Sequence, residues 1–473
     1  MNRNSRKIIC GLLFWRLSLI LIAICLNDFF APLIFSQTAK LPTPPIPTTI
    51  PHPPKREQGQ KYIDEIWDEL EKGTFATPTF DELGTLHEGC TFDELWELAQ
   101  KHNPTLHKQL YLIKAAKGKK TQVGLYPNPV LSYSGDNLGV HGQTGKHGFS
   151  ITQEIVTANK IKLDRNVASY DVAAAQKEYS MEYLKLYNDL KIAHNEMLHA
   201  ILTCNVQQLA KDISQDLLKV ALTLQSKGKS RSIDVLQFRT ILNAATLNYY
   251  QAEKNKLSKW QNITSIIGDP DLPQQPVRGS LIDHSPRRQW QTTWVQFQNT
   301  CPQLELAKLK INQSKIQLAR EKAEKTSNLY ATFSIARDVP AKTNVPFVGV
   351  AAPLKFFDKN QGNIAKAGAE VAAANREFER INLKLRKKLT DVFCQYDNSC
   401  ELINVYEKSI IPDTFEALRQ IGEDYLNGKI TYLELYTQRK TVVDTLIQYL
   451  NALKTKAVTT TQIDGMLLEG NLE

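Results

Sequence analysis

Two parts of this chain alternate apolar and polar side chains in a way that predicts strands. The alternation covers residues 131–134 and 149–152, and it returns over residues 329–335 and 348–352. A period of two indicates strands, and we expect four of about ten residues each, the length that a tilted membrane strand needs. An ordinary surface hairpin would show the same alternation, so the strands alone do not decide between the two.

A helical period follows each pair of strands. We expect uninterrupted helices over residues 159–226 and 363–427, each of about 65 residues and about 100 Å long. Gly228 and Gly428 end these runs and new helices begin after them, so each run should close as a long antiparallel hairpin. The apolar residues recur at spacings of three and four in narrow stripes, typical of coiled-coil seams. The clearest stripes are Leu190, Ala193, Met197, Ile201 and Cys204, and then Tyr432, Leu435, Val442, Leu446, Tyr449 and Leu453.

The same order of elements occurs twice. A helix, expected over residues 92–123 and again over 304–327, precedes each pair of strands, and a long hairpin follows it. Four landmarks recur at offsets of 198, 199, 200 and 197 residues, namely Pro104 and Pro302, Lys160 and Lys359, Gly228 and Gly428, and Gly268 and Gly465. Chance similarity between helical regions would not hold that spacing. The sequence therefore predicts a mainly α-helical fold with a small β portion, made of two strand–strand–long-helix hairpin repeats.

The N-terminal residues have the pattern of an export signal. An apolar run over residues 17–26 follows four basic residues and is too short to span a membrane comfortably, so we expect residues 1–36 to be a signal peptide. Two alternatives stay open, an uncleaved anchor and lipid attachment at Cys25. The remaining divisions are a Pro-rich linker (37–60), an extension of unknown role (61–90), repeat 1 (91–268), an inter-repeat linker (269–300) and repeat 2 (301–473).

Composition excludes some classes of function. A mean hydropathy of −0.33 and 23% charged residues argue against a bundle of membrane-spanning helices. The net charge of +9 is modest for 473 residues, and no dense basic patch interleaved with aromatic residues indicates nucleic-acid binding. The cysteines beyond the signal peptide match no zinc spacing, and we expect most of them to be small buried residues, with one disulfide possible. They are Cys90, Cys204, Cys301, Cys394 and Cys400.

No motif of an enzyme stands out. His194 and His199 share a helix with Glu196, but their spacing matches no known metal motif, and we expect His194 to be a seam or surface residue. The chain has no Gly-x-Ser-x-Gly nucleophile turn. We therefore expect no catalytic residue, no bound metal and no cofactor.

The four strands constrain the assembly. The smallest closed barrels need about eight strands, and open sheet edges cannot lie in lipid, so four strands can span a membrane only if several chains share one barrel. A ring of chains would also cover the narrow helical seams, and the helices would continue the barrel as a tube. The alternative is a secreted or periplasmic coiled-coil scaffold without a pore, which would be soluble without detergent.

Several short motifs resemble the TolC family of outer-membrane efflux proteins. They are residues 91–95 with 102–104, residues 124–129, residues 353–362 and residues 425–428. The resemblance covers residues 91 to 467 and leans toward the heavy-metal-efflux branch. It implies a homotrimer with a shared twelve-stranded barrel in the outer membrane, a helical tunnel across the periplasm, a periplasmic adaptor, an inner-membrane pump and no catalysis. Drugs, metal ions and secreted peptides all pass through such ducts, and the sequence selects neither the cargo nor the class of pump.

The resemblance also suggests functional positions. The hairpin tips are expected to contact the adaptor through Gly228, Lys229, Ser230 and Arg231, and through Gly428, Lys429, Ile430 and Thr431. Asp234 and Glu434, each six residues past a tip glycine, are candidate gate residues together with Arg231 and Tyr425; a solvated surface acid is the other interpretation of both carboxylates. The residues expected to face lipid are Leu131, Tyr133, Phe149 and Ile151.

Overall fold

The computed structural model describes residues 83–139 and 144–470. The expected signal peptide, Cys25, the Pro-rich linker and most of the extension lie outside these residues. The first copy of the expected repeat contains α4 (Phe92–His102), α5 (Pro104–Val123), β2 (Val130–Asp136), β3 (Lys146–Ile155), α6 (Lys160–Ser226) and α7 (Ser232–Ile267). The second copy contains α8 (Trp290–Thr300), α9 (Pro302–Ala323), β5 (Leu329–Asp338), β6 (Thr343–Ala351), α10 (Gln361–Val405), η2 (Tyr406–Ile410), α11 (Ile411–Leu426) and α12 (Tyr432–Asp464).

The helix that precedes each pair of strands is divided, which corrects the prediction of one helix over residues 92–123. Asn103 has an extended backbone (φ −66°, ψ 118°) between α4 and α5, and its side chain accepts a hydrogen bond from the Leu106 N–H at 3.0 Å. Pro104 disfavours the helical region for the residue before it, so the chain turns there. Cys301 has nearly the same backbone (φ −65°, ψ 118°) before Pro302, and α8 lies within the segment expected as the inter-repeat linker.

The second long helix is also interrupted, so the prediction of one helix over residues 363–427 is wrong. A π-helical turn, η2, lies between α10 and α11, and Pro412 occupies the first turn of α11. Proline has no backbone N–H to donate and its ring crowds the carbonyl four residues earlier, which disrupts a regular helix at that point. The sequence interpretation overlooked this proline. Its counterpart in the first copy, α6, runs without a break for 67 residues.

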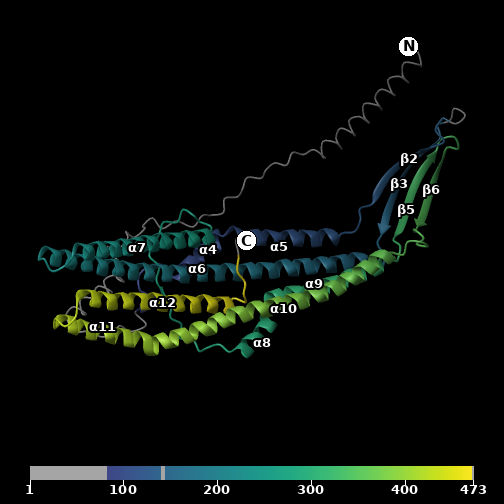
Figure 1. Ribbon diagram of the computed structural model, residues 1–473. Coiled ribbons are helices and arrows are strands. Elements are labelled where there is room, and N and C mark those ends of the chain that lie inside the picture. The colour runs from purple at the N-terminus through teal and green to yellow at the C-terminus, as the bar shows by residue number, and fades with distance from the viewer. Residues whose placement is uncertain (1–82, 140–143, 471–473) are drawn as a thin grey trace, which may run out of the picture. The chain divides into compact units, whose positions relative to one another are not determined.

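The four longer strands form one antiparallel sheet in the order β2-β3-β5-β6. Each hairpin pairs its own two strands, and β3 pairs with β5 between the copies over ten residues, from Lys146–Asp338 to Ile155–Leu329. Figure 1 shows this sheet extending from one end of the helices. Two edges of the sheet, on β2 and β6, have no neighbouring strand among the described residues.

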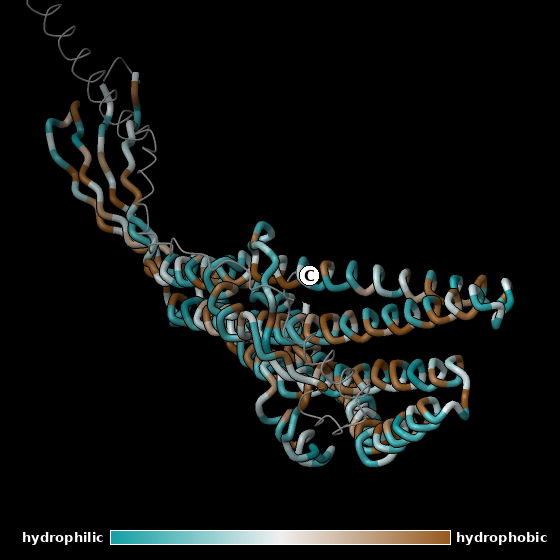
Figure 2. The backbone as a smooth tube through the Cα atoms, turned by 90° about the vertical axis from the view of Figure 1, so that its left-hand side faces the viewer, coloured by the Kyte–Doolittle hydropathy of each residue, from teal (hydrophilic) through white to brown (hydrophobic). Residues whose placement is uncertain are grey.

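The helices form a row that continues the order of the strands. Next to the sheet, α6 packs against α5 and α9, and α9 packs against α10. Toward the far ends, α6 packs against α7 and α12, and α12 packs against α10 and α11. Figure 2 shows apolar and polar residues alternating along the strands and along the long hairpins. Within the described residues, no helix combines the length and the apolar character needed to cross a membrane.

The narrow apolar stripes are already buried within one chain, which corrects the expectation that a ring of chains is needed to cover them. Leu190, Ala193, Met197 and Leu453 are each 1% exposed or less, and Tyr449 is fully buried. They belong to a cluster that joins both hairpins. A short two-stranded sheet covers part of this cluster, where β1 (Thr85–Leu86) pairs with β4 (Gly279–Ser280). The end of the N-terminal extension is therefore attached to the segment between the repeats.

Candidate functional site

The sheet has one strongly apolar face. Residues that lie opposite one another on neighbouring strands point to the same face of a sheet. Two rows of such residues cross all four strands, one made of Leu131, Ile151, Phe333 and Val348, and the other of Tyr133, Phe149, Ile335 and Pro346. Leu131 is 69% exposed and Val348 is 75% exposed, so this apolar face, as we call it, is uncovered. The four residues expected to face lipid all lie on it.

The opposite side of the sheet, the polar face, carries hydroxyl groups in its central part. One row contains Ser132, Ser150, Ser334 and Phe347, and the next contains Val130, Thr152, Thr332 and Gly349. The Thr152 and Thr332 hydroxyls are 3.0 Å apart and share a hydrogen bond across the β3–β5 pair. A sheet with one apolar and one hydroxyl-rich face can separate lipid from water.

A buried lysine holds the sheet to the helices. Lys160, the first residue of α6, is 2% exposed, and its ammonium donates to the Thr326 carbonyl at 2.5 Å and to Asn328 Oδ1 at 2.7 Å. Glu324 Oε1 lies 3.5 Å from the same nitrogen. The turn over residues 156–159 is thereby fixed on the corner between α9 and β5, and we call this arrangement the joint.

Polar groups extend the joint in two directions. Thr157 donates its hydroxyl to the Ser327 carbonyl at 2.7 Å, and Asn328 donates to the Glu154 carboxylate on the polar face at 2.7 Å. Glu324 also binds Arg320 at 2.6 Å. Although burial raises the pKa of Glu324, the hydrogen bonds from Arg320 and Lys355 lower it below the ordinary value. The joint is a fully bonded set of charges and not an isolated buried cation.

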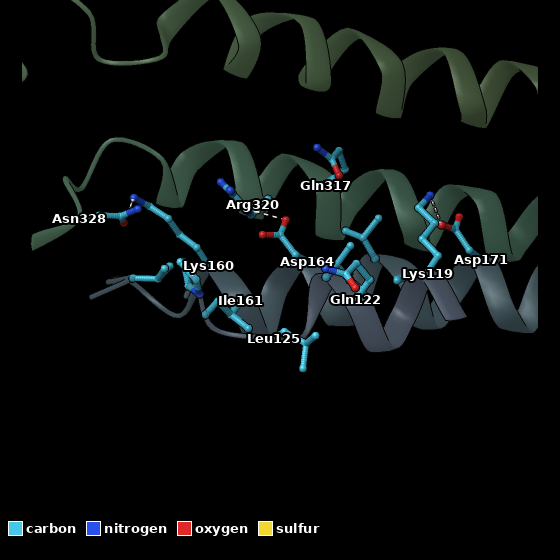
Figure 3. A pocket seen from close by; sticks show the side chains of 15 residues that line it. Lys119, Gln122, Leu125, Lys160, Ile161, Asp164, Asp171, Gln317, Arg320 and Asn328 are labelled. Carbon is cyan, nitrogen blue, oxygen red and sulfur yellow. Dashed lines mark hydrogen bonds and ion pairs between the residues drawn. The ribbon is translucent and has the colours of Figure 1, made fainter. Parts of the chain in front are cut away.

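A cavity of about 500 Å³ lies beside the joint, between α5, α6 and α9. Figure 3 shows the side chains that line it, among them Lys119, Asp164 and Arg320. Two ion pairs connect its walls, Lys119 with Asp171 and Arg320 with Asp164, each at 2.7 Å. These pairs connect the helices directly below the sheet.

The two hairpin tips have the same backbone. Gly228 and Gly428 have φ values of 71° and 72°, in the left-handed region that favours glycine. In each tip the glycine N–H and the following lysine N–H bond back to carbonyls of the preceding helix, each at 2.9 Å, which is the Schellman arrangement of a helix end. The predicted tip residues 228–231 and 428–431 therefore occupy the two turns between the long helices.

The two candidate gate acids both bind the starts of their own helices. Glu434 accepts from the Thr431 N–H at 2.6 Å and from the Thr431 hydroxyl at 2.9 Å. Asp234 accepts from the Arg231 N–H at 3.0 Å and from its guanidinium at 2.9 Å. Hydrogen bonds from Arg231 lower the pKa of Asp234, and the Thr431 N–H lowers the pKa of Glu434. Capping is a local role that the sequence interpretation did not assign.

The other tip residues are arranged differently in the two tips. In tip 1 (residues 227–231), the side chain of Arg231 is 81% exposed and pairs with Asp234 in the first turn of α7 at 2.9 Å. In tip 2 (residues 427–431), Lys429 pairs with Asp424 at 2.9 Å. Tyr425 packs edge-on against Tyr432 with ring centroids 5.6 Å apart, so this candidate gate residue bridges the two helices that meet at the tip.

The histidines and cysteines form no reactive cluster. His194 is 3% exposed and packs edge-on against Phe92, and burial lowers its pKa to about 4. His199 lies 3.0 Å from Asn451 Oδ1, and burial likewise lowers its pKa to about 4. Within residues 83–139 and 144–470, no three His, Cys, Asp or Glu side chains are placed to hold a metal, and none of the five cysteines there forms a disulfide. Of these five, Cys204 and Cys301 are buried and Cys394 is exposed, which corrects the expectation that most of them are buried.

Sequence reasoning missed the joint. Lys160 was noted only as a landmark that recurs as Lys359, yet Lys359 is exposed and lies before Asn360, the residue that precedes α10. Asn159 and Asn360 have matching left-handed backbones (φ 55° and 61°), and the turn that ends at Asn360 (residues 352–360) is longer than the one that ends at Asn159 (residues 156–159). A left-handed asparagine before a long helix is a usable signal, but the partner corner 324–328 lies too far along the chain to be recognised.

Comparison with known proteins gives consistent matches. Residues 95–269 match the family model described as outer membrane efflux protein. The cobalt-zinc-cadmium resistance protein CzcC of Cupriavidus metallidurans is 21% identical over 402 residues, which cover 84% of this chain and 93% of that protein. These matches confirm the resemblance that the sequence motifs indicated.

Solved structures share the fold. The outer membrane protein VceC from Vibrio cholerae superposes with a TM-score of 0.65 at 15% identity, covering 80% of this chain and 94% of that chain. CusC, whose structures concern folding and transmembrane channel formation, superposes with a TM-score of 0.64 at 13% identity. The match covers 84% of this chain and 99% of that chain. The prediction of a mainly helical, duplicated fold with a small sheet is confirmed.

Proposed function

We propose that this chain, which belongs to the outer membrane efflux protein family, forms an efflux channel across the outer membrane and serves as the exit duct of a larger export assembly. One observation carries the proposal. A four-stranded sheet with an apolar face and a hydroxyl-rich face has both edges open, and it continues into a row of helices in the same order. Such a sheet can form one part of a β-barrel but cannot close a barrel by itself.

The duct is a homotrimer in this proposal. Three copies supply twelve strands, enough to close a barrel whose apolar face meets lipid and whose polar face lines the lumen. Leu131, Tyr133, Phe149 and Ile151 then contact lipid. The long hairpins continue the barrel as a tunnel through the periplasm. The relevant divisions of the chain are residues 91–268 and 301–473, one repeat each, with an exported and processed N-terminus.

The tips are where the other proteins of the assembly dock. Both tips are turns at the ends of long hairpins and carry exposed Lys229, Arg231 and Lys429, so they suit a periplasmic adaptor with complementary acidic groups. An inner-membrane pump delivers cargo through that adaptor. The gate is formed near the tips by Asp234, Glu434, Arg231 and Tyr425, and opening requires some of their local bonds to rearrange.

The cargo is a small molecule or a metal ion. The first choice is a divalent metal cation, because CzcC, whose name states resistance to cobalt, zinc and cadmium, is similar along 93% of its length. Carboxylates at a constriction attract cations and repel anions, which agrees with Glu434 and Asp234 near the entrance. The chain itself performs no catalysis in this proposal.

Membrane fractionation with conductance recording tests the proposal. The full chain should appear in the outer-membrane fraction as a heat-resistant trimer and give discrete currents in planar bilayers. Glu434→Ala should lower cation selectivity or change the conductance, with Glu401→Ala, far from the tip in sequence, as the matched exposed acid. A protein that is soluble without detergent and gives no currents would support the scaffold alternative and refute the duct.

A further inference from the structure

The apolar face of the sheet ends abruptly at the end that lies away from the helices (Figure 1). On β3, the next residue on this face beyond Phe149 is His147. On β5, the residue beyond Ile335 is Arg337, which lies directly opposite His147. The distance along β3 from Ile155, its last residue, to His147 is about 26 Å at about 3.3 Å per residue, comparable with the apolar band of about 25 Å in membrane barrels. In the proposed duct, the row of His147 and Arg337 therefore lies where lipid tails give way to headgroups.

The charges at this level differ between the two faces of the sheet. On the polar face, Lys146 lies opposite Asp136 and Asp338 and pairs with Asp338 at 3.2 Å, so its charge is compensated. On the apolar face, Arg337 is exposed and forms no ion pair with any residue that the structure describes. The uncompensated positive charge therefore lies on the face that meets lipid in the proposed duct, and not on the face that lines its lumen.

The neighbours of Arg337 leave most of its donors available. One terminal N–H of its guanidinium donates to Asn344 Oδ1 at 3.2 Å, across the β5–β6 pair. A guanidinium has five N–H donors, so the others remain for an anion, and the amide N–H groups of the exposed Asn344 lie beside them. His147 is fixed by hydrogen bonds with the Thr144 carbonyl at 2.8 Å and the Tyr133 hydroxyl at 2.6 Å. These bonds assemble several donors on one exposed surface.

We propose that Arg337 and Asn344, with His147 beside them, bind a phosphate group of a lipid headgroup in the outer leaflet. The proposal rests on the proposed duct, which places this end of the sheet at the outer surface of the membrane. A planar guanidinium matches two oxygens of a phosphate at once, and such charge-assisted hydrogen bonds are strong. The acyl chains of the same lipid contact the apolar face next to the site, through Phe149 and Ile335. A free phosphate ion gains nothing from that face, which favours a lipid as the ligand.

Binding of lipid A to the full-length trimer in detergent, measured by native mass spectrometry, tests the proposal. The diphosphoryl form should bind, and the dephosphorylated form should bind at least about tenfold more weakly. Arg337→Gln should weaken binding of the diphosphoryl form about tenfold. Arg337→Lys should weaken it less, because the charge remains while the planar fork is lost. Lys146→Gln removes a positive charge at the same level on the polar face and should leave binding unchanged.

The outcomes separate the lipid site from the duct. Equal weakening by Arg337→Gln and Lys146→Gln overturns the site, because total charge and not the apolar face then decides binding. Equal binding of the two forms of lipid A overturns it, and so does release of the lipid by an excess of inorganic phosphate, which indicates a site for free anions. A conducting, heat-resistant trimer that binds no lipid A refutes the site and leaves the duct standing. A soluble protein that gives no currents refutes both.

Discussion

The two long hairpins arose from one pattern but differ in their first helix. In the first copy, α6 continues without a break for 67 residues. In the second copy the corresponding stretch is divided into α10, the π-turn η2 and α11, with Pro412 just after the turn. The ends of both hairpins are nevertheless alike, since each begins after a left-handed asparagine and each tip turns on a left-handed glycine.

This difference shows which parts of the repeat the two copies hold in common. The strand register, the positions of the asparagines and the tips agree between them, because these set where the sheet and the turns lie. The middle of the helix is free to differ, provided that its seam remains buried. The bend in the second copy is stabilised by Tyr449, which donates to Glu407 at 2.9 Å and packs near the ring of Tyr406. We expect the first hairpin to be the stiffer one.

The largest effect is expected at the joint, where Lys160 of the first copy binds the corner between α9 and β5 of the second copy. Lys160→Met removes a buried ammonium and leaves its acceptors and Glu324 without it, so the protein should lose about 3–5 kcal/mol of stability. Lys359→Met, the exposed counterpart, should change little. Thermal unfolding of the purified trimer followed by circular dichroism measures both. Equal losses for the two variants would contradict a special role for Lys160.

The next effect concerns the uninterrupted helix. Asp212→Pro places a proline in α6 at the position that corresponds to Pro412 and should cost about 3 kcal/mol, because it removes one helical hydrogen bond and its ring clashes with the preceding turn. Asp212→Ala controls for loss of the side chain, and Pro412→Ala should stay within about 0.5 kcal/mol. The same unfolding measurement applies. If Asp212→Pro is tolerated like Pro412, the two helices are equally able to bend.

A smaller effect separates two tyrosines at equivalent positions. Tyr449→Phe removes the hydrogen bond that the fully buried Tyr449 donates to Glu407 and should cost about 1 kcal/mol. Tyr249, 200 residues earlier, bonds to Glu253 at 3.2 Å from a partly exposed position, so Tyr249→Phe should cost clearly less. Hydrogen exchange of the amides around residues 403–411 would show whether the bend loosens in Tyr449→Phe alone. If these amides exchange no faster in either variant, Tyr449 does not stabilise the bend.

The smallest effect is the pH dependence of the tips. The pKa values of Asp234 and Glu434 are lowered, so both stay charged and both caps persist from about pH 8 to about pH 5, and they are lost only as the pH falls through these lowered values. Cation selectivity in bilayers should therefore be constant over that range. Glu434→Gln should lower it already at neutral pH, and Asp234→Asn should do so less. A change in the parent protein near pH 6 would assign the selectivity to other groups.

Much of this fold could be predicted from the sequence, because the decisive signals are local and periodic. The period of two over residues 131–134 and the narrow stripe from Leu190 to Cys204 sufficed for the strands and the seams. The breaks at Asn103 and Pro412 were missed although proline marks both. The joint at Lys160 and the caps at Asp234 and Glu434 were missed for different reasons. The joint depends on residues more than 160 positions away from Lys160. The cap at Glu434 needed only the capping pattern Thr431-x-x-Glu434.

The small β1–β4 sheet ties together residues that are far apart in the chain. The Thr85 hydroxyl donates to the Ser280 hydroxyl at 2.9 Å across 195 residues, so everything between them lies inside one closed loop. Contacts of such sequence separation form late in folding, since the ends cannot meet until the loop between them has condensed. Hydrogen-exchange protection of the Thr85 and Ser280 amides during refolding would therefore report when the first repeat has finished folding.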